Sequence, residues 1–327
     1  MGRAGMRDDA ETVTLEMTPF LADALAGLSG EPRSLPSKYF YDREGSVLFD
    51  RICETPEYYP TRCEIEIMRD YGPEMAEPIG PEAMIIELGS GSSLKTPLLL
   101  ERLERPAAYV PVDIAGEHLR MAAESLARRF PSLPILPVNA DFTGEFPLPD
   151  PAVTPRRRVI YFPGSTIGNF PPPEATTLLR RLARMTGAGG GLLIGVDLKK
   201  DVRTLEAAYN DAAGVTRAFN LNLLERLRRE LHAEVSVHRF EHRAVYNESE
   251  GRIEMHLVSR AAQSIRLGGR EFTFRAGETI HTENSYKYDP AGFAALAREA
   301  GWRKEGFWTD TRGLFSVQLF TAQEPGA

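Results

Sequence analysis

The residues with the clearest capacity for chemistry stand in one short turn, Glu87 to Ser93, which reads Glu-Leu-Gly-Ser-Gly-Ser-Ser. Gly89 and Gly91 lack the Cβ atoms that would keep a ligand away from the backbone. In open α/β sheets, ligands bind in the crevice at the carboxyl ends of the strands, and an acid followed by Gly-x-Gly suits that place. The turn, with Ser90 between its glycines, therefore predicts a site where a ligand presses against the main chain.

Two classes of cofactor use such a turn, and the neighbouring residues separate them. The NAD fingerprint requires a third glycine three residues after the second, but Leu94 stands at that position. Glu87 would face a phosphate badly, whereas it would receive a cationic amino-acid group well. S-adenosylmethionine (SAM) carries no phosphate and has a positively charged amine. We therefore expect SAM as cofactor and a methyltransferase as the enzyme class, with a nicotinamide enzyme as the alternative.

Acidic residues also follow the next two predicted strands. Asp113 is placed to accept hydrogen bonds from ribose hydroxyls, and Asp141 with Phe142 to bind the adenine amino group and pack on its ring. A single aspartate at the end of a strand is about equally often a helix N-cap. Three such features in chain order favour one cofactor site over three separate caps.

A loop rich in glycine and proline, residues 163–173, follows the fourth predicted strand. In this kind of fold the loop faces the transferred methyl group. Asn169 offers a small amide that suits rigid binding of a substrate amine or carboxylate, and Gly164 lies near the start of the loop. From chemistry alone, a purely structural proline-rich loop is an equal alternative.

An alternation of strand and helix between residues 83 and 197 would position these groups. The predicted strands are apolar runs at 84–86, 108–112, 133–138, 158–162 and 191–196, with helices beginning at Thr96 and spanning 116–129. Continuous apolar strands separated by helices predict a parallel sheet covered on both faces. A helix at 290–300 and a strand at 315–320 return to this pattern near the C-terminus.

The remaining segments have a different pattern. A helix at 19–28 has Thr18 as N-cap and ends at Gly30, and a helical zone at 202–231 precedes β-like alternation at 235–246, 252–258 and 264–274. We therefore expect an α/β fold with two parts. One is a class I Rossmann-like methyltransferase core of residues 61–197 and 286–327. The other is a smaller α+β substrate-binding domain of residues 8–60 and 198–285.

Composition excludes several other classes of function. The formal charge of −7 argues against binding of nucleic acid through its phosphates. Cys53 and Cys63 are too few for a disulfide framework or a zinc site, and His238 with His242 lies in a strand-like stretch, so no metal is expected. No apolar run approaches the ~20 residues that cross a bilayer. We expect a cytoplasmic, monomeric protein that binds a small molecule and no membrane.

Several segments together resemble one family, the ergothioneine-pathway L-histidine Nα-methyltransferases. They are Tyr39-Phe40-Tyr41-Asp42, Pro56 to Arg62, the turn Glu87 to Ser93, the loop Gly164 to Phe170, and Thr282 to Tyr288, in this order along the chain. The resemblance extends from about Pro36 to Thr321. It implies three successive methylations of the α-amino group of L-histidine, which give the betaine hercynine.

The resemblance also implies roles for individual residues. The implied cofactor contacts are Gly89, Lys95, Asp113, Asp141 and Phe142. The residues implied near the amino-acid end of the substrate are Tyr41, Tyr58, Gly164, Asn169 and Tyr209. Those implied for the imidazole pocket are Met255, Glu283 and Ser285. We expect Tyr41, Asn169 and Gly164 nearest the reaction, with the Tyr41 hydroxyl as a candidate proton acceptor.

The chemistry of Glu283 and Ser285 agrees with this assignment. A carboxylate and a hydroxyl can hold both nitrogens of an imidazole, one as acceptor and one as donor or acceptor. Tyr209 and Met255, taken alone, are as well explained by core packing. Two alternatives stay open: a methyltransferase of the same family acting on another amino acid such as tryptophan, and a non-catalytic SAM-binding protein.

Overall fold

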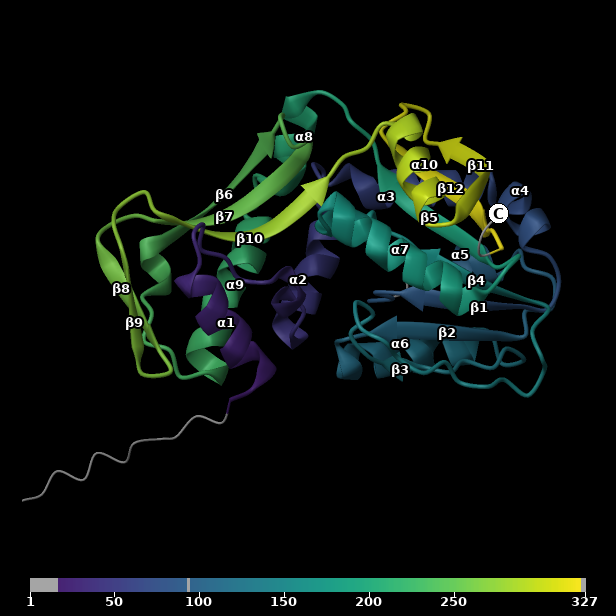
Figure 1. Cartoon of the computed structure of the whole chain (residues 1–327), viewed down its shortest axis with the longest axis horizontal. Coiled ribbons are helices and arrows are strands. Elements are labelled where there is room, and N and C mark those ends of the chain that lie inside the picture. The colour runs from purple at the N-terminus through teal and green to yellow at the C-terminus, as the bar shows by residue number, and fades with distance from the viewer. Residues whose placement is uncertain (1–16, 93–94, 325–327) are drawn as a thin grey trace, which may run out of the picture.

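The computed structural model describes residues 17–92 and 95–324, which form two lobes side by side (Figure 1). One lobe is built on a seven-stranded sheet, and the other contains a three-stranded sheet and a two-stranded hairpin. Leu94, on which the choice between cofactors partly depended, lies outside the described residues, as do residues 8–16 of the predicted smaller domain.

The large sheet is the doubly wound sheet that the apolar runs predict. Its strand order is β11-β12-β5-β4-β1-β2-β3, in which the neighbours from β5 to β3 pair in parallel and β12 is antiparallel to both β5 and β11. The strands are β1 (Ala83–Leu88), β2 (Ala108–Asp113), β3 (Val138–Asn139), β4 (Arg157–Phe162), β5 (Gly191–Asp197), β11 (Trp302–Thr309) and β12 (Phe315–Ala322).

Two features of this sheet differ from the prediction. The run 133–138 forms only the short β3 and an isolated bridge at Ile135, because Pro134 and Pro137 have no N–H to donate to a ladder. β11 was not predicted as a strand. It pairs only with β12 at the edge of the sheet, and several of its residues are exposed, so its sequence lacks the apolar run that identified the central strands.

Helices cover both faces of the large sheet. The helices packed on one face are α3 (Tyr59–Asp70), α4 (Gly72–Ile79), α5 (Thr96–Leu100) and α6 (Gly116–Arg129). The other face is covered by α7 (Pro172–Thr186) and α10 (Pro290–Glu299), and α7 crosses in front of the sheet in Figure 1. Ile85 of β1 faces the first group and Ile86 faces the second. Within the described residues, no helix is both long and apolar enough to cross a membrane.

The smaller lobe contains the antiparallel strands that were expected, and one more. Its elements are α8 (Val202–Tyr209), α9 (Val215–Glu230), β6 (Phe240–Asn247), β7 (Arg252–Ser259), β8 (Gln263–Leu267), β9 (Arg270–Phe274) and β10 (Thr279–Tyr286). The three-stranded sheet has the order β10-β7-β6. β10, which was not predicted, carries Glu283 and Ser285.

Two predicted boundaries in this lobe were wrong. The helical zone 202–231 is interrupted by Gly214, which has a left-handed φ of 71°, and the Asp211 carboxylate then accepts hydrogen bonds from the first amides of α9. Only Phe240 onward in the run 235–246 is strand, because a 3₁₀ turn, Val237–Arg239, precedes it.

The N-terminal segment packs against α9 of the smaller lobe. It comprises α1 (Pro19–Ser29), capped by Thr18 as expected, a 3₁₀ turn at Ser37–Phe40 and α2 (Arg43–Glu54). Phe40 stacks on Phe219 with ring centroids 4.4 Å apart, and Asn222 donates a hydrogen bond to Asp42 at 2.8 Å. α2 thereby comes to lie between the lobes, beside the carboxyl ends of the large sheet (Figure 1).

Candidate active site

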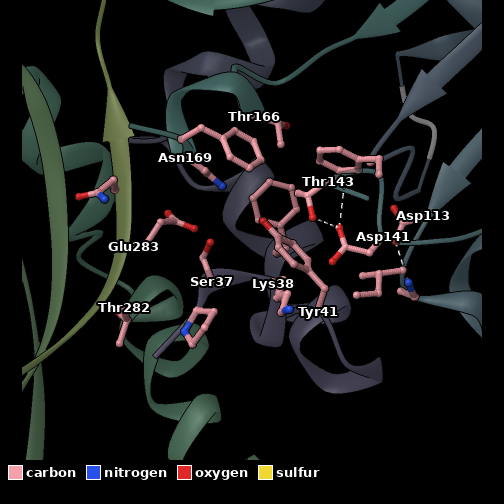
Figure 2. A pocket seen from close by; sticks show the side chains of 18 of the residues that line it. Ser37, Lys38, Tyr41, Asp113, Asp141, Thr143, Thr166, Asn169, Thr282 and Glu283 are labelled. Atoms are coloured by element: carbon pink, nitrogen blue, oxygen red, sulfur yellow. Dashed lines mark hydrogen bonds between the residues drawn. The ribbon is translucent and has the colours of Figure 1, made fainter. Parts of the chain in front are cut away.

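A cavity of about 500 Å³ lies between the two lobes, at the carboxyl ends of β1, β2 and β4. Asn169 and Glu283 point into it from one side, and Asp113 and Asp141 lie across from them (Figure 2). Residues from the turn after β1, the end of β2, the loop after β4, α2 and β10 contribute to its lining. Segments far apart in sequence therefore share one cavity.

A smaller recess of about 50 Å³ continues this cavity toward the small lobe. The lining of the recess includes every residue predicted for the substrate: Tyr41, Tyr58, Gly164, Asn169, Tyr209, Met255, Glu283 and Ser285. Both spaces share the lining residues Tyr41, Phe49, Thr166, Asn169 and Glu283. The two spaces meet at these side chains, so a ligand in one would touch a ligand in the other.

Backbone geometry explains the two glycines of the turn. Gly89 and Gly91 have φ of 64° and 49°, in the left-handed region that favours glycine. The amide of Gly91 donates to Asp113 Oδ2 at 2.9 Å, and Asp113 Oδ1 accepts from the amide of Ala115 at 2.8 Å. A Cβ on Gly89 would lie 3.6 Å from the ring of Phe142. The turn, the end of β2 and Phe142 thus form one continuous wall.

Three of the predicted cofactor residues, Glu87, Ser90 and Lys95, are not among the described residues that line the cavity. Glu87 Oε2 accepts hydrogen bonds from Thr96 Oγ1 and Tyr109 Oη, both at 2.6 Å. Burial raises the pKa of Glu87 to about 7, against the opposing effect of these two bonds. The carboxyl of Glu87 therefore links the turn to α5 and β2 through these hydrogen bonds.

Lys95 takes part in a link between the two loops of the site. Its Nζ donates to Glu64 Oε2 at 2.5 Å, and the amide of Gly164 donates to the same oxygen at 2.9 Å. Glu64, on α3, is fully buried. Glu64 was not identified from the sequence, because its role depends on contacts with residues 31 and 100 positions away.

The loop after β4 is held tightly against β10. Gly164 and Ser165 have φ of 75° and 58°, and the loop ends in a 3₁₀ turn, Thr166–Asn169. A Cβ on Gly168 would lie only 2.8 Å from the carbonyl oxygen of Tyr286. The glycine permits this approach, which places Asn169 next to the strand that carries Glu283.

The local structure of β10 directs Glu283 into the recess. The ladder between β7 and β10 shifts register between His281 and Glu283, which is the signature of a β-bulge at Thr282. After the shift, Glu283 pairs directly with Met255 on β7. Burial raises the pKa of Glu283 to about 8, although the charge of Lys287 opposes the shift. This carboxyl changes its charge in the range where enzymes operate.

The structure separates four neighbouring tyrosines. Tyr41 and Tyr58 line the recess, whereas Tyr39 donates to Asp23 and Tyr59 donates to Asp197. Burial, reinforced by nearby acidic groups, raises the pKa of Tyr41 and of Tyr58 well above its usual value. Both hydroxyls are therefore protonated and suited to hydrogen bonding. This does not suit the role of proton acceptor that was predicted for Tyr41.

Sequence reasoning also missed residues that support the recess. Phe49 and Thr166 line it, and Asp197 and Lys287 lie buried beneath Tyr209 and Ser285. Period-2 alternation would have placed Lys287 on the same side as Glu283 and Ser285, had β10 been recognised as a strand. Among the residues with described positions, no group of three or more His, Cys, Asp or Glu is arranged to hold a metal ion.

Comparison with known proteins identifies the family of this chain. A family profile described as histidine-specific methyltransferase, SAM-dependent, matches residues 20–322. The chain belongs to this family. It is 42% identical to histidine N-alpha-methyltransferase of Mycolicibacterium smegmatis, over 91% of this chain and 93% of the relative. The corresponding protein of Mycobacterium tuberculosis is 40% identical, over 91% of this chain and 93% of that relative. Ergothioneine biosynthesis protein 1 of Neurospora crassa is 33% identical over 85% of this chain, which spans 32% of that longer relative.

The cavity fits the SAM on which this family of methyltransferases depends. The glycine turn leaves the main chain open to close approach, and Asp113 has carboxylate lone pairs left for ribose hydroxyls after its two backbone bonds. Phe142 packs against Phe162 and Phe170 beside Asp141, and this offers an apolar surface for a flat base. A nicotinamide enzyme is thereby set aside.

Proposed function

We propose that this protein transfers methyl groups from SAM to the α-amino group of L-histidine, three times in succession, to give hercynine for ergothioneine biosynthesis. Family membership and the two relatives at 42% and 40% identity support the substrate. The observation that carries the proposal is that the recess, with Glu283 and Ser285 in its wall, opens into the cofactor cavity at Asn169.

The position of each residue supports a division of roles within the recess. Asn169 and Tyr41, which line both spaces, are assigned to the amino-acid end of the substrate, next to the transferred methyl, as the family resemblance implies. Tyr58, Gly164 and Tyr209 complete that end. The imidazole is assigned to the part of the wall formed by Glu283, Ser285 and Met255, of which Ser285 and Met255 are buried. Lys95 and Glu87 are assigned to the cofactor side as residues that shape its loops.

The mechanism is direct displacement, in which the bound cofactor supplies an electrophilic methyl group to the neutral amine. Because the methyl is already activated, the protein contributes chiefly by positioning, an effect that can reach ~7–11 kcal/mol. Tyr41 and Asn169 orient the amine at the junction of the two spaces. The amine loses its proton before transfer, and the protonated Tyr41 and Tyr58 are not its acceptors.

An aromatic wall suits the cationic product. Tyr41, Phe49, Tyr58 and Tyr209 form a chain of edge-to-face contacts with ring centroids 5.7, 6.4 and 6.2 Å apart. Aromatic faces attract quaternary ammonium groups, and they do so without demanding hydrogen bonds that a trimethylated nitrogen no longer makes. The same wall therefore accepts the amine at each stage of methylation.

We further propose that the chain is a cytoplasmic monomer with the two domains expected from sequence: residues 61–197 and 286–327, and residues 8–60 and 198–285. A single chain lines both spaces, which supports a monomer as the working unit. Leu198 bridges to Tyr288 at the point where the chain leaves and re-enters the core, which supports the domain boundaries there. Light scattering during gel filtration tests the oligomeric state.

The activity test uses the purified chain with SAM and each of the twenty amino acids, with products resolved by mass spectrometry. We expect histidine to gain three methyl groups and the other amino acids to react far more slowly. Methylation of tryptophan in preference to histidine would support the first alternative. Binding of S-adenosylhomocysteine in a thermal-shift assay, without turnover of any amino acid, would support a non-catalytic protein. Glu283 argues against tryptophan, since an indole would leave this half-buried carboxyl without a hydrogen-bond partner.

A further inference from the structure

A buried lysine lies directly behind the recess, outside the residues assigned to the substrate. The side chain of Lys287 has no exposed area, and its Nζ lies 2.8 Å from Asp197 Oδ2, 3.0 Å from Tyr209 Oη and 2.8 Å from Ser285 Oγ. Tyr209 Oη and Ser285 Oγ are in turn 2.7 Å apart. Both hydroxyls belong to the recess wall, so the lysine reaches the substrate site only through them.

The charge of Lys287 is secured by its surroundings. Burial acts to lower its pKa, but the opposite charge of Asp197 and the hydrogen bonds to Asp197 and Tyr209 outweigh burial, and the pKa is raised. Asp197 is itself ionised, since Lys287 and Lys200 lower its pKa against the effect of burial. Tyr59 and Lys200 complete the shell of Asp197 at 2.9 and 2.5 Å.

The number of protons on each group determines which atom donates in each of these hydrogen bonds. An ammonium carries three N–H donors and no acceptor, so Tyr209 and Ser285 must both accept from Lys287. A phenol is a stronger donor and a weaker acceptor than an aliphatic hydroxyl, so the bond between the two runs from Tyr209 to Ser285. Ser285 Oγ then accepts two hydrogen bonds, which uses both its lone pairs. Only its own proton is left, and among the described residues no further protein acceptor is recorded for it.

We propose that Lys287 is a specificity-determining positioning residue, which obliges Ser285 to act as a hydrogen-bond donor toward the substrate ring. Glu283 lies two residues before Ser285 on the same side of β10, and the oxygen of its carboxyl that carries no proton supplies the acceptor. The recess would then select a ring with one N–H and one unprotonated nitrogen, which is the neutral imidazole. An imidazolium or an indole would place N–H or C–H against the Ser285 proton. The inference rests on the proposed histidine specificity and explains how it is achieved.

The test compares histidine with two analogues in the full-length protein. Pyrrol-3-ylalanine keeps the N–H but lacks the acceptor nitrogen, and thiazol-4-ylalanine keeps the acceptor but lacks the N–H. In the natural sequence, we expect kcat/KM for pyrrol-3-ylalanine to be about 100-fold below that for histidine, since an unpaired polar group in the pocket penalises the wrong ligand. In Lys287→Met, the Ser285 hydroxyl can turn its proton away from the substrate. The ratio of kcat/KM for histidine to that for pyrrol-3-ylalanine should then fall below about 10-fold.

Tyr209→Phe provides a second variant that preserves shape. It removes the bond donated to Ser285 and should reduce the same ratio, even where Lys287→Met folds poorly. Lys200→Met is the matched control, since it removes a buried cation from Asp197 without touching either hydroxyl. Its ratio should stay that of the natural sequence. Melting temperature with S-adenosylhomocysteine checks that each variant retains its fold and its cofactor site.

The outcomes separate this inference from the proposed function. If histidine is methylated but Lys287→Met and Tyr209→Phe keep the 100-fold ratio, Lys287 has only a structural role and the inference is wrong. An equal rate for pyrrol-3-ylalanine and histidine in the natural sequence would also overturn it. If no variant and no natural protein methylates histidine, the proposed function itself fails. A ratio that falls in both variants and not in Lys200→Met supports the inference.

Discussion

The two halves of the site are built in different ways. The cofactor half consists of strand ends that follow one another along the chain, and its shape depends on backbone: the left-handed Gly89 and Gly91, and the amides that Asp113 binds. The substrate half is assembled from α2, the residue that precedes α3, the loop after β4, α8, α9 and two antiparallel strands. Its shape depends on side chains held by other side chains.

This difference suggests that the two halves carry separate properties. A turn of main chain at the end of a parallel sheet suits any enzyme that uses the same cofactor, because it does not distinguish one methyl acceptor from another. A recess of buried polar groups discriminates among acceptors, since a wrong ligand leaves those groups unpaired. We therefore expect changes in one half to leave the other largely intact, except at the residues where the loop after β4 touches β10.

The largest effect is expected at Glu283. Glu283→Ala should lower kcat/KM for histidine by about 10³-fold, because a polar pocket can discriminate by as much as ~10⁴ when a partner is missing. The affinity for S-adenosylhomocysteine, measured by calorimetry, should change less than about 2-fold if the halves are separate. Glu278→Gln, at the partly exposed residue just before the same strand, is the control and should behave as the natural protein. An equal loss of cofactor affinity would contradict the separation.

The reverse experiment changes Gly89 in the cofactor half. Gly89→Ala puts a side chain at a φ of 64°, which costs roughly 1–2 kcal/mol, and directs a methyl group toward the cavity. We expect cofactor affinity to fall about 30-fold, equivalent to about 2 kcal/mol, without a change in preference among amino acids. Gly187→Ala has a similar φ of 76° with no atom within 4 Å, far from the site. It should lower the melting temperature but leave cofactor affinity unchanged, and equal affinity losses in both variants would refute the local explanation.

A smaller effect is expected where the halves touch. Gly168→Ala would place a Cβ 2.8 Å from the carbonyl oxygen of Tyr286, so the loop that carries Asn169 must move away from β10. Such a shift should lower kcat by about 10-fold, since a misplacement of ~1 Å can cost up to 10²-fold. Gly144→Ala is the control, because its closest neighbour would be 3.6 Å away. Unchanged turnover in Gly168→Ala would mean that the loop positions Asn169 without β10.

The same contrast decides how much of the molecule could be predicted from sequence. β1, β2, β4 and β5 are continuous apolar runs, and Asp113 at the end of β2 and Asp141 after β3 mark the cofactor cavity without knowledge of any distant contact. β10 was not recognised, because its inward side carries Glu283 and Ser285 where an apolar alternation would be expected. The prolines near β3 were the one local signal that should have shortened a predicted strand.

The features that could not be predicted depend on contacts between residues far apart in the sequence. The choice of Tyr41 over Tyr39 depends on whether a hydroxyl meets Asp23, 16 residues away, and Glu64 matters only because Lys95 and Gly164 approach it. Family resemblance supplied the residues of the recess, but not the network beneath them. Spacing along the sequence carries no information about the hydrogen bonds among Lys287, Tyr209 and Ser285.

The smallest predicted effect is on the dependence of stability on pH, and it compares one carboxyl from each half: the half-buried Glu283 and the buried Glu87. Burial raises the pKa of Glu283 to about 8 and that of Glu87 to about 7, so the folded protein holds protons that the unfolded chain releases near the ordinary value of 4.5. Each group therefore destabilises the fold progressively as pH rises from about 4.5 to its own raised pKa, and no further change follows above it.

Glu283→Gln should remove this penalty, and its melting temperature should exceed that of the natural protein by about 2–4 °C at pH 9, on the scale of about 1 kcal/mol. Near pH 4.5, the two curves should converge. Glu87→Gln should give a smaller gain that is complete by about pH 7, because Thr96 and Tyr109 already stabilise the Glu87 carboxylate. Scanning calorimetry at several pH values measures both. Parallel curves for Glu283→Gln would mean that water in the recess stabilises the charged carboxylate. In that case Glu283 would not destabilise the fold of the substrate half. The two halves would then differ in geometry but not in their effect on stability.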